Sequence, residues 1–127
     1  VVTSLVGKFG TPYRSGYAAS KHALHGYFDA LRAELFEFGI SVNMICPGFI
    51  KTNVSINALT EQGDKLNVMD DAQANGMSAA KCARKISRAI RKNKREVYIG
   101  GKEIYAVYLK RFLPGLFARI LRKAKVR

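Results

Sequence analysis

Apolar side chains recur every three or four residues in three stretches of the chain, and this period is typical of amphipathic helices. The first stretch covers residues 13–38 and ends at Gly39, a helix-stop residue. Its apolar positions are Tyr17, Leu24, Phe28, Leu31 and Leu35. The second begins after Ser78, a helix-capping residue, and the third begins at Glu103 and is interrupted at Pro114. The pattern therefore predicts three helical regions.

Short apolar runs between these regions predict buried strands at residues 1–4, 40–46 and 95–100. Polar residues dominate 51–77, which predicts a long excursion with at most short helices. The order is strand, long helix, strand, long loop, helix, strand and helix. Such alternation predicts an α/β fold with parallel strands. A long loop inside a compact domain is more often functional than idle.

The chain has 127 residues, 48% of them apolar, which suits one small domain with a real core. No apolar run is long enough to span a membrane, and we expect a cytoplasmic protein. The chain opens on "VVTS", the end of a strand, so we expect it to belong to a longer protein. Cys46 and Cys82 lie in apolar segments and are expected to be reduced and packed. His22 and His25 lack a third metal ligand nearby, so we expect no metal site and place both at a helix surface or dimer contact.

The net charge of +13 comes entirely from the second half, because residues 1–64 carry five basic and five acidic side chains. Residues 103–127 form a basic amphipathic segment, a candidate for contact with an anionic membrane surface. Alternatively, its apolar side packs on the sheet or on a second subunit. Its apolar positions are Phe112, Leu113, Leu116, Phe117, Ile120 and Leu121, and its bordering cations are Lys110, Arg111, Arg119, Arg122, Lys123 and Lys125.

An isoelectric point near 10.1 also fits a nucleic-acid-binding module. No zinc-finger spacing or RNP-like aromatic motif accompanies it, so nucleic acid is an unlikely partner. A non-catalytic interaction fragment is the other alternative to an enzyme.

Tyr17 and Lys21 are four apart and would be neighbours on one helix face. An ammonium about 4 Å from a phenol favours the phenolate by roughly 4 kcal/mol at an effective dielectric near 20. Such a phenol suits proton transfer. The spacing alone is weak, because Tyr98 and Lys102 repeat it across Gly100-Gly101. Other residues near strand ends strengthen the proton-transfer interpretation of Tyr17 and Lys21.

The residues near strand ends are a serine and a turn. Ser4 closes the first strand, and Pro47-Gly48-Phe49-Ile50-Lys51-Thr52 follows the second. Strand ends share one crevice in an α/β sheet, so these residues are expected to converge with Tyr17 and Lys21.

These motifs, with Tyr17-Ala18-Ala19-Ser20-Lys21, resemble the carboxyl-terminal half of a short-chain dehydrogenase/reductase, most closely the branch of 11β-hydroxysteroid-dehydrogenase-like and lipid-handling enzymes. The resemblance implies a doubly wound Rossmann-type sheet, an NAD or NADP cofactor and an alcohol or ketone substrate, including lipid- or steroid-like ones. Tyr17 would be the general acid/base, and Lys21 would tune it and bind the nicotinamide ribose. Ser4 would polarise the substrate oxygen.

The resemblance also assigns the turn and the loop. Pro47 and Gly48 would shape the cofactor turn, and the Ile50 backbone and Thr52 hydroxyl would hold the carboxamide. Residues 54–77 would be the substrate loop, with pocket-lining side chains from Asn57, Leu59, Met69 and Met77. The long helix would support a homo-oligomer.

Two parts of the family pattern have no counterpart in this sequence. Nothing matches the glycine-rich turn G-x-x-x-G-x-G, and the asparagine of the catalytic tetrad has no equivalent. We therefore expect residues 1–127 to be a partial dinucleotide-binding and catalytic domain that is inactive alone.

Overall fold

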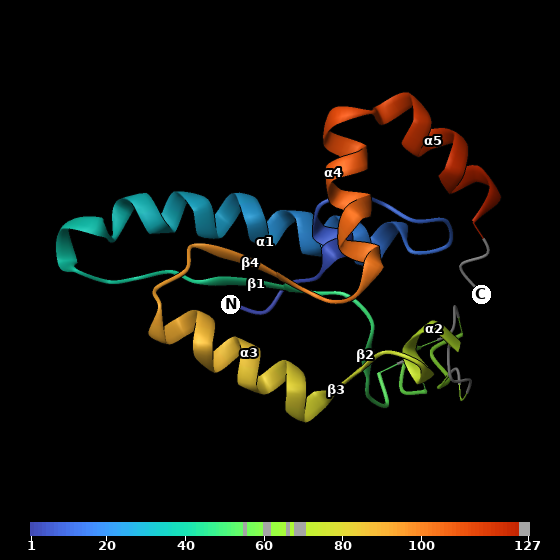
Figure 1. The fold of residues 1–127 in the computed structure, drawn as a ribbon, viewed down its shortest axis with the longest axis horizontal. Helices are drawn as coiled ribbons and strands as arrows, with labels where there is room; N and C mark the ends of the chain where they lie inside the picture. The colour runs from blue at the N-terminus through green and yellow to red at the C-terminus, as the bar shows by residue number, and fades with distance from the viewer. Residues whose placement is uncertain (55, 60–61, 66, 68–70, 125–127) are drawn as a thin grey trace.

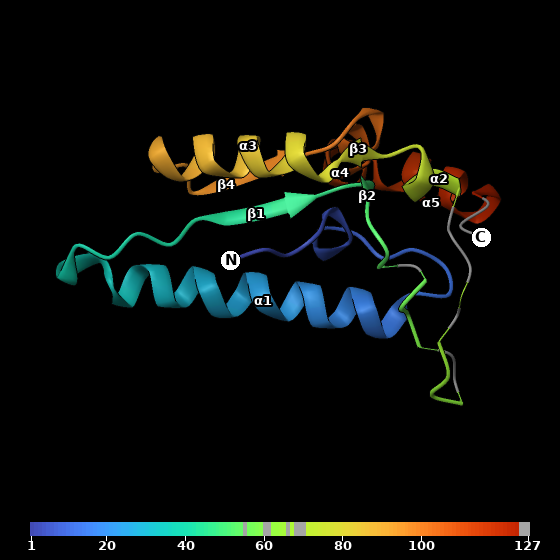
Figure 2. The same cartoon turned by 90° about the horizontal axis from the view of Figure 1, so that it is seen from below.

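The centre of the protein is a parallel pair of strands with a helix on each face. The computed structural model describes residues 1–54, 56–59, 62–65, 67 and 71–124. Strand β1 (Met44–Pro47) pairs with β4 (Glu96–Ile99), and Val2 adds a parallel bridge to Ile45 on the other side of β1. Helices α1 (Ser15–Glu34) and α3 (Ala79–Arg91) cover opposite faces (Figures 1 and 2). This confirms an α/β fold with parallel strands, part of a Rossmann-type sheet.

Strand β1 is shorter than the predicted strand at 40–46 and lies further along the chain. Met44, Ile45 and Cys46 are at most 2% exposed, as expected for a strand covered on both faces. Ile40 is 51% exposed. The Asn43 amide nitrogen donates to the Lys94 carbonyl at 2.7 Å, so side-chain bonding fixes the chain just before β1. The apolar run alone could not show where pairing begins.

Helix α1 occupies the predicted region but starts two residues later. Tyr13 has a φ of 62°, a left-handed conformation that cannot continue a right-handed helix. At the other end, the 3₁₀ turn η2 (Phe36–Phe38) follows α1, and Gly39 with a φ of 67° closes it as predicted. Within α1 only Ala18 and His25 are buried, so its apolar stripe is partly exposed.

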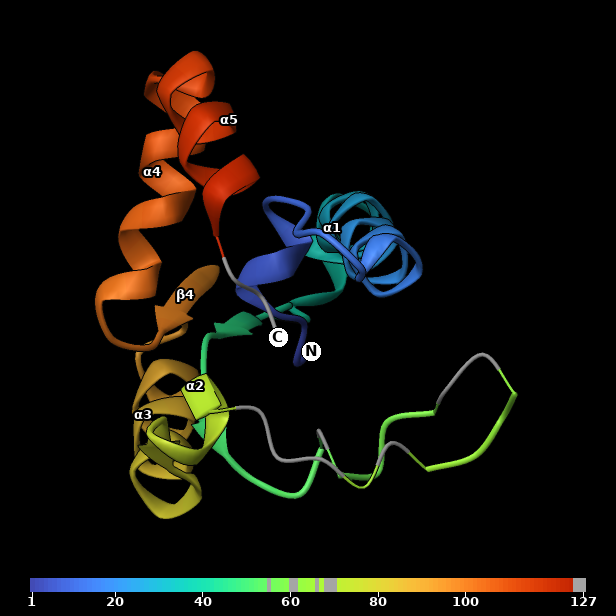
Figure 3. The same ribbon diagram turned by 90° about the vertical axis from the view of Figure 1, so that its right-hand side faces the viewer.

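The excursion after β1 contains two short strands that the sequence did not predict. Strand β2 (Ile50–Lys51) pairs in parallel with β3 (Met77–Ser78), and helix α2 (Asp71–Ala74) precedes β3. Two-residue strands leave no periodic signal. The described residues 56–59 and 62–65, between β2 and α2, extend away from the sheet (Figure 3). Ser78 caps α3, as predicted, by accepting a hydrogen bond from the Lys81 backbone at 3.4 Å.

The carboxyl-terminal region folds back over the start of the chain. The 3₁₀ turn η3 (Lys102–Ile104) leads into α4 (Tyr105–Phe112), and α5 (Pro114–Lys123) begins with proline in its first turn. Val107 and Phe117 are buried against Leu5 and Phe9, near the 3₁₀ turn η1 (Leu5–Gly7). Among the described residues, no helix combines the length and apolarity needed to cross a bilayer.

Candidate functional site

Helix α1 places Tyr17 and Lys21 on one face, one turn apart. The Lys21 ammonium lies 5.5 Å from the centroid of the Tyr17 ring, within cation–π range. Tyr17 is 46% exposed. No described residue forms a hydrogen bond with the Tyr17 hydroxyl or the Lys21 ammonium.

Ser4 lies where the chain leaves the bridge to β1. The Thr3 amide donates to the Ile45 carbonyl at 2.8 Å, which fixes this strand end. Ser4 is buried, and its hydroxyl caps η1 by accepting from the Val6 amide at 3.2 Å. The same oxygen lies 3.5 Å from the Pro47 carbonyl. The structure thus joins Ser4 to Pro47, while among the described residues no hydrogen bond links Ser4 to Tyr17.

The turn after β1 is held in place by Glu103. The Glu103 carboxylate accepts from the Phe49 amide at 3.1 Å, and the Gly48 amide donates to the Ile99 carbonyl at 2.8 Å. A Cβ atom at Gly48 would collide with the Glu103 side chain, so this close approach requires glycine. Glycine, carboxylate and strand end together fix the position of the turn.

Ile50 and Thr52 follow on the same turn. Ile50 pairs with Met77 across β2 and β3. The exposed Thr52 hydroxyl donates weakly to the Ile50 carbonyl, at 3.4 Å. This turn can therefore present a hydroxyl and backbone groups to a planar amide.

The described members of the sequence-predicted substrate set have different surroundings. Leu59 is 70% exposed and bridges to Lys65, while the Asn57 amide donates to the Asn53 carbonyl at 3.0 Å. Met77 packs on the core between the sheet and α3. Met69 lies outside the described residues. A role for Asn57, Leu59 and Met69 in substrate binding stays a prediction.

The placement of His25 at a helix surface or dimer contact was wrong. His25 is 8% exposed, and its Nε2 lies 3.3 Å from the Thr3 hydroxyl and 3.8 Å from the Cys46 sulfur. Its Nδ1 is 3.6 Å from the Glu96 carboxylate. Because Tyr17, Lys21 and His25 recur every four residues, they share one face of α1. That spacing was the available signal for a histidine turned towards the strand ends.

Burial and nearby charges set the acidity of this cluster. Burial lowers the pKa of His25, and the positive charge of Lys8 lowers it further. Burial alone would raise the pKa of Glu96, but hydrogen bonds from Lys8, at 2.8 Å, and from Tyr98 bring it below its usual range. Burial raises the pKa of Cys46 to about 12, so this thiol stays protonated. Both cysteines are free and buried, as predicted.

The second tyrosine–lysine pair has a different environment. Tyr98 lies in β4, where burial and the Glu96 carboxylate raise its pKa, and its ring packs against Tyr108 at 6.0 Å. Lys102 lies in η3, so no continuous helix joins the two residues. Tyr98 is therefore a packed, protonated phenol rather than a second proton-transfer group.

Acidification is expected to destabilise the fold through His25 and Glu96. The His25 pKa is below 6.5 in the folded state, so the unfolded chain binds protons more readily and stability falls as pH drops below 6.5. Glu96, with a pKa below 4.5, adds a second loss in more acidic solution. Urea unfolding of the full-length protein between pH 7.5 and 5.5 measures the first effect. The slope should shrink in His25→Gln, and an unchanged slope would contradict the assignment.

Comparisons with known proteins point to one family. A family model described as short chain dehydrogenase matches residues 1–63. The chain is 42% identical over 122 residues to dehydrogenase/reductase SDR family member 7B of Danio rerio, covering 95% of this chain and 40% of the relative. For the Bos taurus protein of the same name, identity is 45% over 121 residues, covering 94% and 37%.

An insect relative extends the match along the whole chain. Dehydrogenase/reductase SDR family protein 7-like of Drosophila melanogaster is 36% identical over 127 residues, covering 99% of this chain and 39% of the relative. The chain thus spans about two fifths of the length of these relatives. Together with the parallel strands, these matches show that the chain belongs to the short-chain dehydrogenase/reductase family.

Proposed function

We propose that the protein containing this chain is an NAD(P)-dependent oxidoreductase that interconverts an alcohol and a carbonyl compound. The observation that carries the proposal is the Lys21 ammonium 5.5 Å from the centroid of the exposed Tyr17 ring. Family membership supports hydride chemistry with a nicotinamide. The names of the relatives reported above do not identify a substrate, and we propose a lipid- or steroid-like compound bound through Asn57, Leu59 and Met69.

The residues of the turn fit a nicotinamide. Gly48 has no side chain, Ile50 offers backbone groups, and Thr52 has an exposed hydroxyl near them. When bound, the nicotinamide supplies or accepts a hydride at the substrate carbon. We assign its carboxamide to Ile50 and Thr52, with Pro47 and Gly48 shaping the turn, and its ribose to Lys21.

The protein's own groups would handle the proton. In reduction, the Tyr17 hydroxyl gives its proton to the substrate oxygen as charge develops there, and the Lys21 ammonium stabilises the phenolate that remains. The Ser4 hydroxyl, now directed at the Pro47 carbonyl, would instead donate to the substrate oxygen. Oxidation runs the same steps in reverse.

Turnover assays test this proposal. The full-length protein should oxidise a panel of alcohols, including sterols, with NAD⁺ or NADP⁺, and absorbance at the reduced nicotinamide band reports the reaction. The purified 127-residue chain should be inactive, because its sequence has no glycine-rich turn for the adenosine side of the cofactor. Turnover by the isolated chain would contradict that part. Salt-sensitive nucleic-acid binding without dehydrogenase activity would contradict the whole proposal.

Gly48→Ala tests the cofactor turn. The added methyl group must displace the Glu103 carboxylate, which releases the Phe49 amide and moves the turn. We expect the KM for the cofactor to rise about tenfold, as a misplaced positioning group would give. Gly26→Ala on α1 is the matched control, since a Cβ there meets no neighbour within 4 Å. An unchanged cofactor KM in Gly48→Ala would remove the turn from the site.

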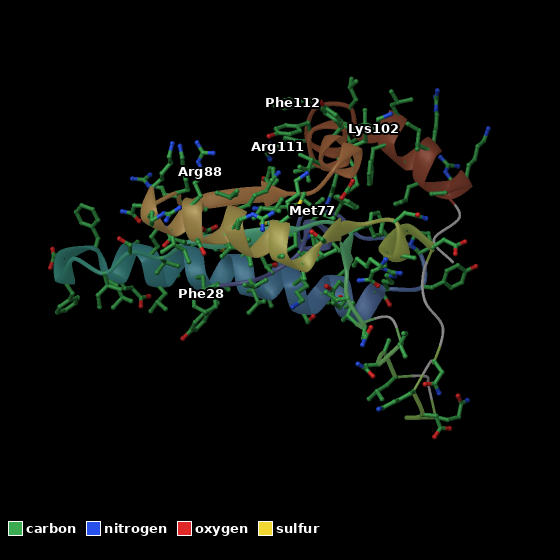
Figure 4. All side chains as sticks on the ribbon, turned by 60° about the horizontal axis from the view of Figure 1, so that its bottom comes forward. Phe28, Met77, Arg88, Lys102, Arg111 and Phe112 are labelled. Carbon is green, nitrogen blue, oxygen red and sulfur yellow. The ribbon has the colours of Figure 1, made fainter. Side chains whose placement is uncertain are left out.

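We also propose that α4 and α5 contact an anionic membrane surface. Part of their apolar side packs on the core through Phe117, whose ring meets Phe9 at 5.5 Å. The rest is exposed beside basic side chains, with Phe112 at 73% and Ile120 at 50% exposure. Figure 4 shows Phe112 and Arg111 at the outer end of α4. Such a surface suits an interfacial helix. We further propose a homo-oligomer through the exposed apolar positions of α1.

Liposome sedimentation measures the membrane contact. Replacing both Leu116 and Ile120 with Ser should reduce binding of the full-length protein to phosphatidylserine vesicles, because each loses exposed apolar area. Leu59→Ser, at another exposed apolar position, is the control and should bind normally. Unchanged binding of the double variant would contradict the proposal. If the double variant binds vesicles normally but changes its oligomeric state, this surface contacts a second subunit and not a membrane.

A further inference from the structure

Thr3 connects the strand end that carries Ser4 to the helix that carries Lys21. Thr3 is 5% exposed, and its hydroxyl donates to the Lys21 carbonyl at 3.3 Å. The same oxygen lies 3.3 Å from Nε2 of His25, one turn further along α1. One buried hydroxyl therefore contacts two successive turns of α1.

The number of protons available fixes the direction of these bonds. A threonine hydroxyl has a single proton, and here that proton goes to the Lys21 carbonyl. The Thr3 oxygen is then left as acceptor, so Nε2 of His25 must carry the proton between them. Nδ1 of His25 has no hydrogen bond and faces Glu96 at 3.6 Å. His25 is thus oriented by its hydrogen bond to Thr3, while its other ring nitrogen lies near the carboxylate without a hydrogen bond to any described residue.

The carboxylate end of this network is anchored to two other elements. Glu96 lies in β4 and forms an ion pair with Lys8 at 2.8 Å. The Lys8 carbonyl in turn accepts from the Lys110 ammonium of α4 at 3.0 Å. Hydrogen bonds and an ion pair therefore connect α4 to Glu96 of β4, and Glu96 lies 3.6 Å from His25 Nδ1.

Gly7 shows how closely α1 and η1 approach at this point. A Cβ atom at Gly7 would lie 2.8 Å from both His25 Nε2 and the Thr3 hydroxyl oxygen. Neither side chain can retreat without giving up its hydrogen bond. The junction consequently holds its geometry by close packing as well as by polar contacts.

We propose that His25 and Thr3 are positioning residues that set the distance between Ser4 and the Tyr17–Lys21 pair. The inference rests on the proposed function. Thr3 is the residue before Ser4, and its contact is with the backbone of Lys21 itself, so a shift at this junction moves both halves of the site relative to each other. A displacement of about 1 Å in such a site can cost about 100-fold in rate.

Four substitutions in the full-length protein test the proposal. Thr3→Val and His25→Leu remove the polar contacts at similar size, and we expect kcat to fall about 10- to 100-fold with a cofactor KM within about threefold of wild type. Thr3→Ser keeps the hydroxyl, and His25→Gln places an amide nitrogen near the position of Nε2. These two should retain kcat to within about threefold. His22→Gln is the control, because His22 is exposed and, within the part of the chain that the structure describes, its side chain bonds the Ala18 carbonyl of its own helix and nothing else.

Stability measurements separate positioning from a purely structural role. Thermal unfolding gives the folded fraction of each variant, and kcat is then expressed per folded molecule. Thr3→Val or His25→Leu with wild-type kcat per folded molecule would overturn the proposal. If Thr3→Val or His25→Leu fails to fold, His25→Asn is compared with His25→Gln instead. The shorter Asn side chain places its amide near the position of Nδ1, and it does not reach the position of Nε2. Equal kcat for Asn and Gln would also overturn it.

Different results would refute the proposed function and the positioning role. A full-length protein that shows no turnover, or a Tyr17→Phe variant with normal turnover, would refute the proposed function. If Tyr17→Phe loses kcat as expected while His25→Leu keeps wild-type kcat, the proposed function stands and only the positioning role is refuted.

Discussion

Replacing Tyr17 with phenylalanine is expected to lower kcat of the full-length protein by about 10³-fold, within the range found for loss of a general acid/base. The substitution removes one oxygen and leaves the ring beside Lys21. Tyr17 is 46% exposed and makes no hydrogen bond through its hydroxyl among the described residues, so the fold loses little. Steady-state turnover at saturating cofactor and substrate measures the effect, and circular dichroism and thermal unfolding confirm the fold.

Tyr27→Phe is the matched control for this experiment. Tyr27 lies on the same helix, is 63% exposed and packs only edge-on against Phe28 at 5.0 Å. Its loss of a hydroxyl should leave kcat within a factor of about two, as expected for a surface change away from the site. Comparable activity in the Tyr17 and Tyr27 variants would mean that the Tyr17 phenol moves no proton in turnover.

Replacing Lys21 with methionine is expected to affect both chemistry and cofactor binding. Methionine keeps much of the apolar stem but removes the charge 5.5 Å from the Tyr17 ring. We expect kcat to fall about 100-fold, because the positive charge that stabilises the phenolate developing in the transition state is lost. The cofactor KM should rise about tenfold, the loss expected from one hydrogen bond to a charged group.

Lys21→Arg separates charge from geometry. Arginine keeps the positive charge but spreads it over a planar group that does not replace a point charge. We expect an intermediate kcat, between those of wild type and Lys21→Met. A Lys21→Met variant with wild-type kcat would exclude electrostatic tuning. Loss confined to cofactor KM would restrict Lys21 to binding.

Local sequence patterns predicted the frame of this site. The three- and four-residue spacing placed Tyr17 and Lys21 on one helical face, and the ring-to-ammonium contact confirms that geometry. The short apolar runs gave the central strands and their parallel order. These features depend on residues close together in the chain, which is why period and spacing contain them. The chemical roles of Tyr17, Lys21 and Ser4 stay predictions until turnover is measured.

The supporting groups could not be predicted, because their contacts join distant parts of the chain. Glu96 lies 88 residues from Lys8, and Glu103 lies 54 residues from Phe49, so no local pattern links them. The distribution of charged residues did single out these two glutamates. Glu96 and Glu103 are the only acidic residues after residue 80, within a segment of sixteen basic ones. Both hold backbone or side chains next to the candidate site, which is a reason for an isolated carboxylate in a basic region.

The buried cluster around His25 shows a second limit of sequence patterns. Periodicity assigns apolar residues to a core, so a histidine on α1 was placed at the surface. Burial instead depends on Thr3 and Gly7, which approach α1 from the preceding strand end. The paired strands β2 and β3 were missed for a related reason, since two residues are too few to show alternation.

A double-mutant comparison tests most directly whether Lys21 assists proton transfer by the Tyr17 phenol. Tyr17→Phe, Lys21→Met and the variant with both substitutions are compared with the full-length wild type, and kcat for alcohol oxidation is measured at saturating cofactor and substrate. Because the two groups are predicted to act as one unit, the double variant should lose little more kcat than Tyr17→Phe alone. Single losses that multiply in the double variant would contradict the account.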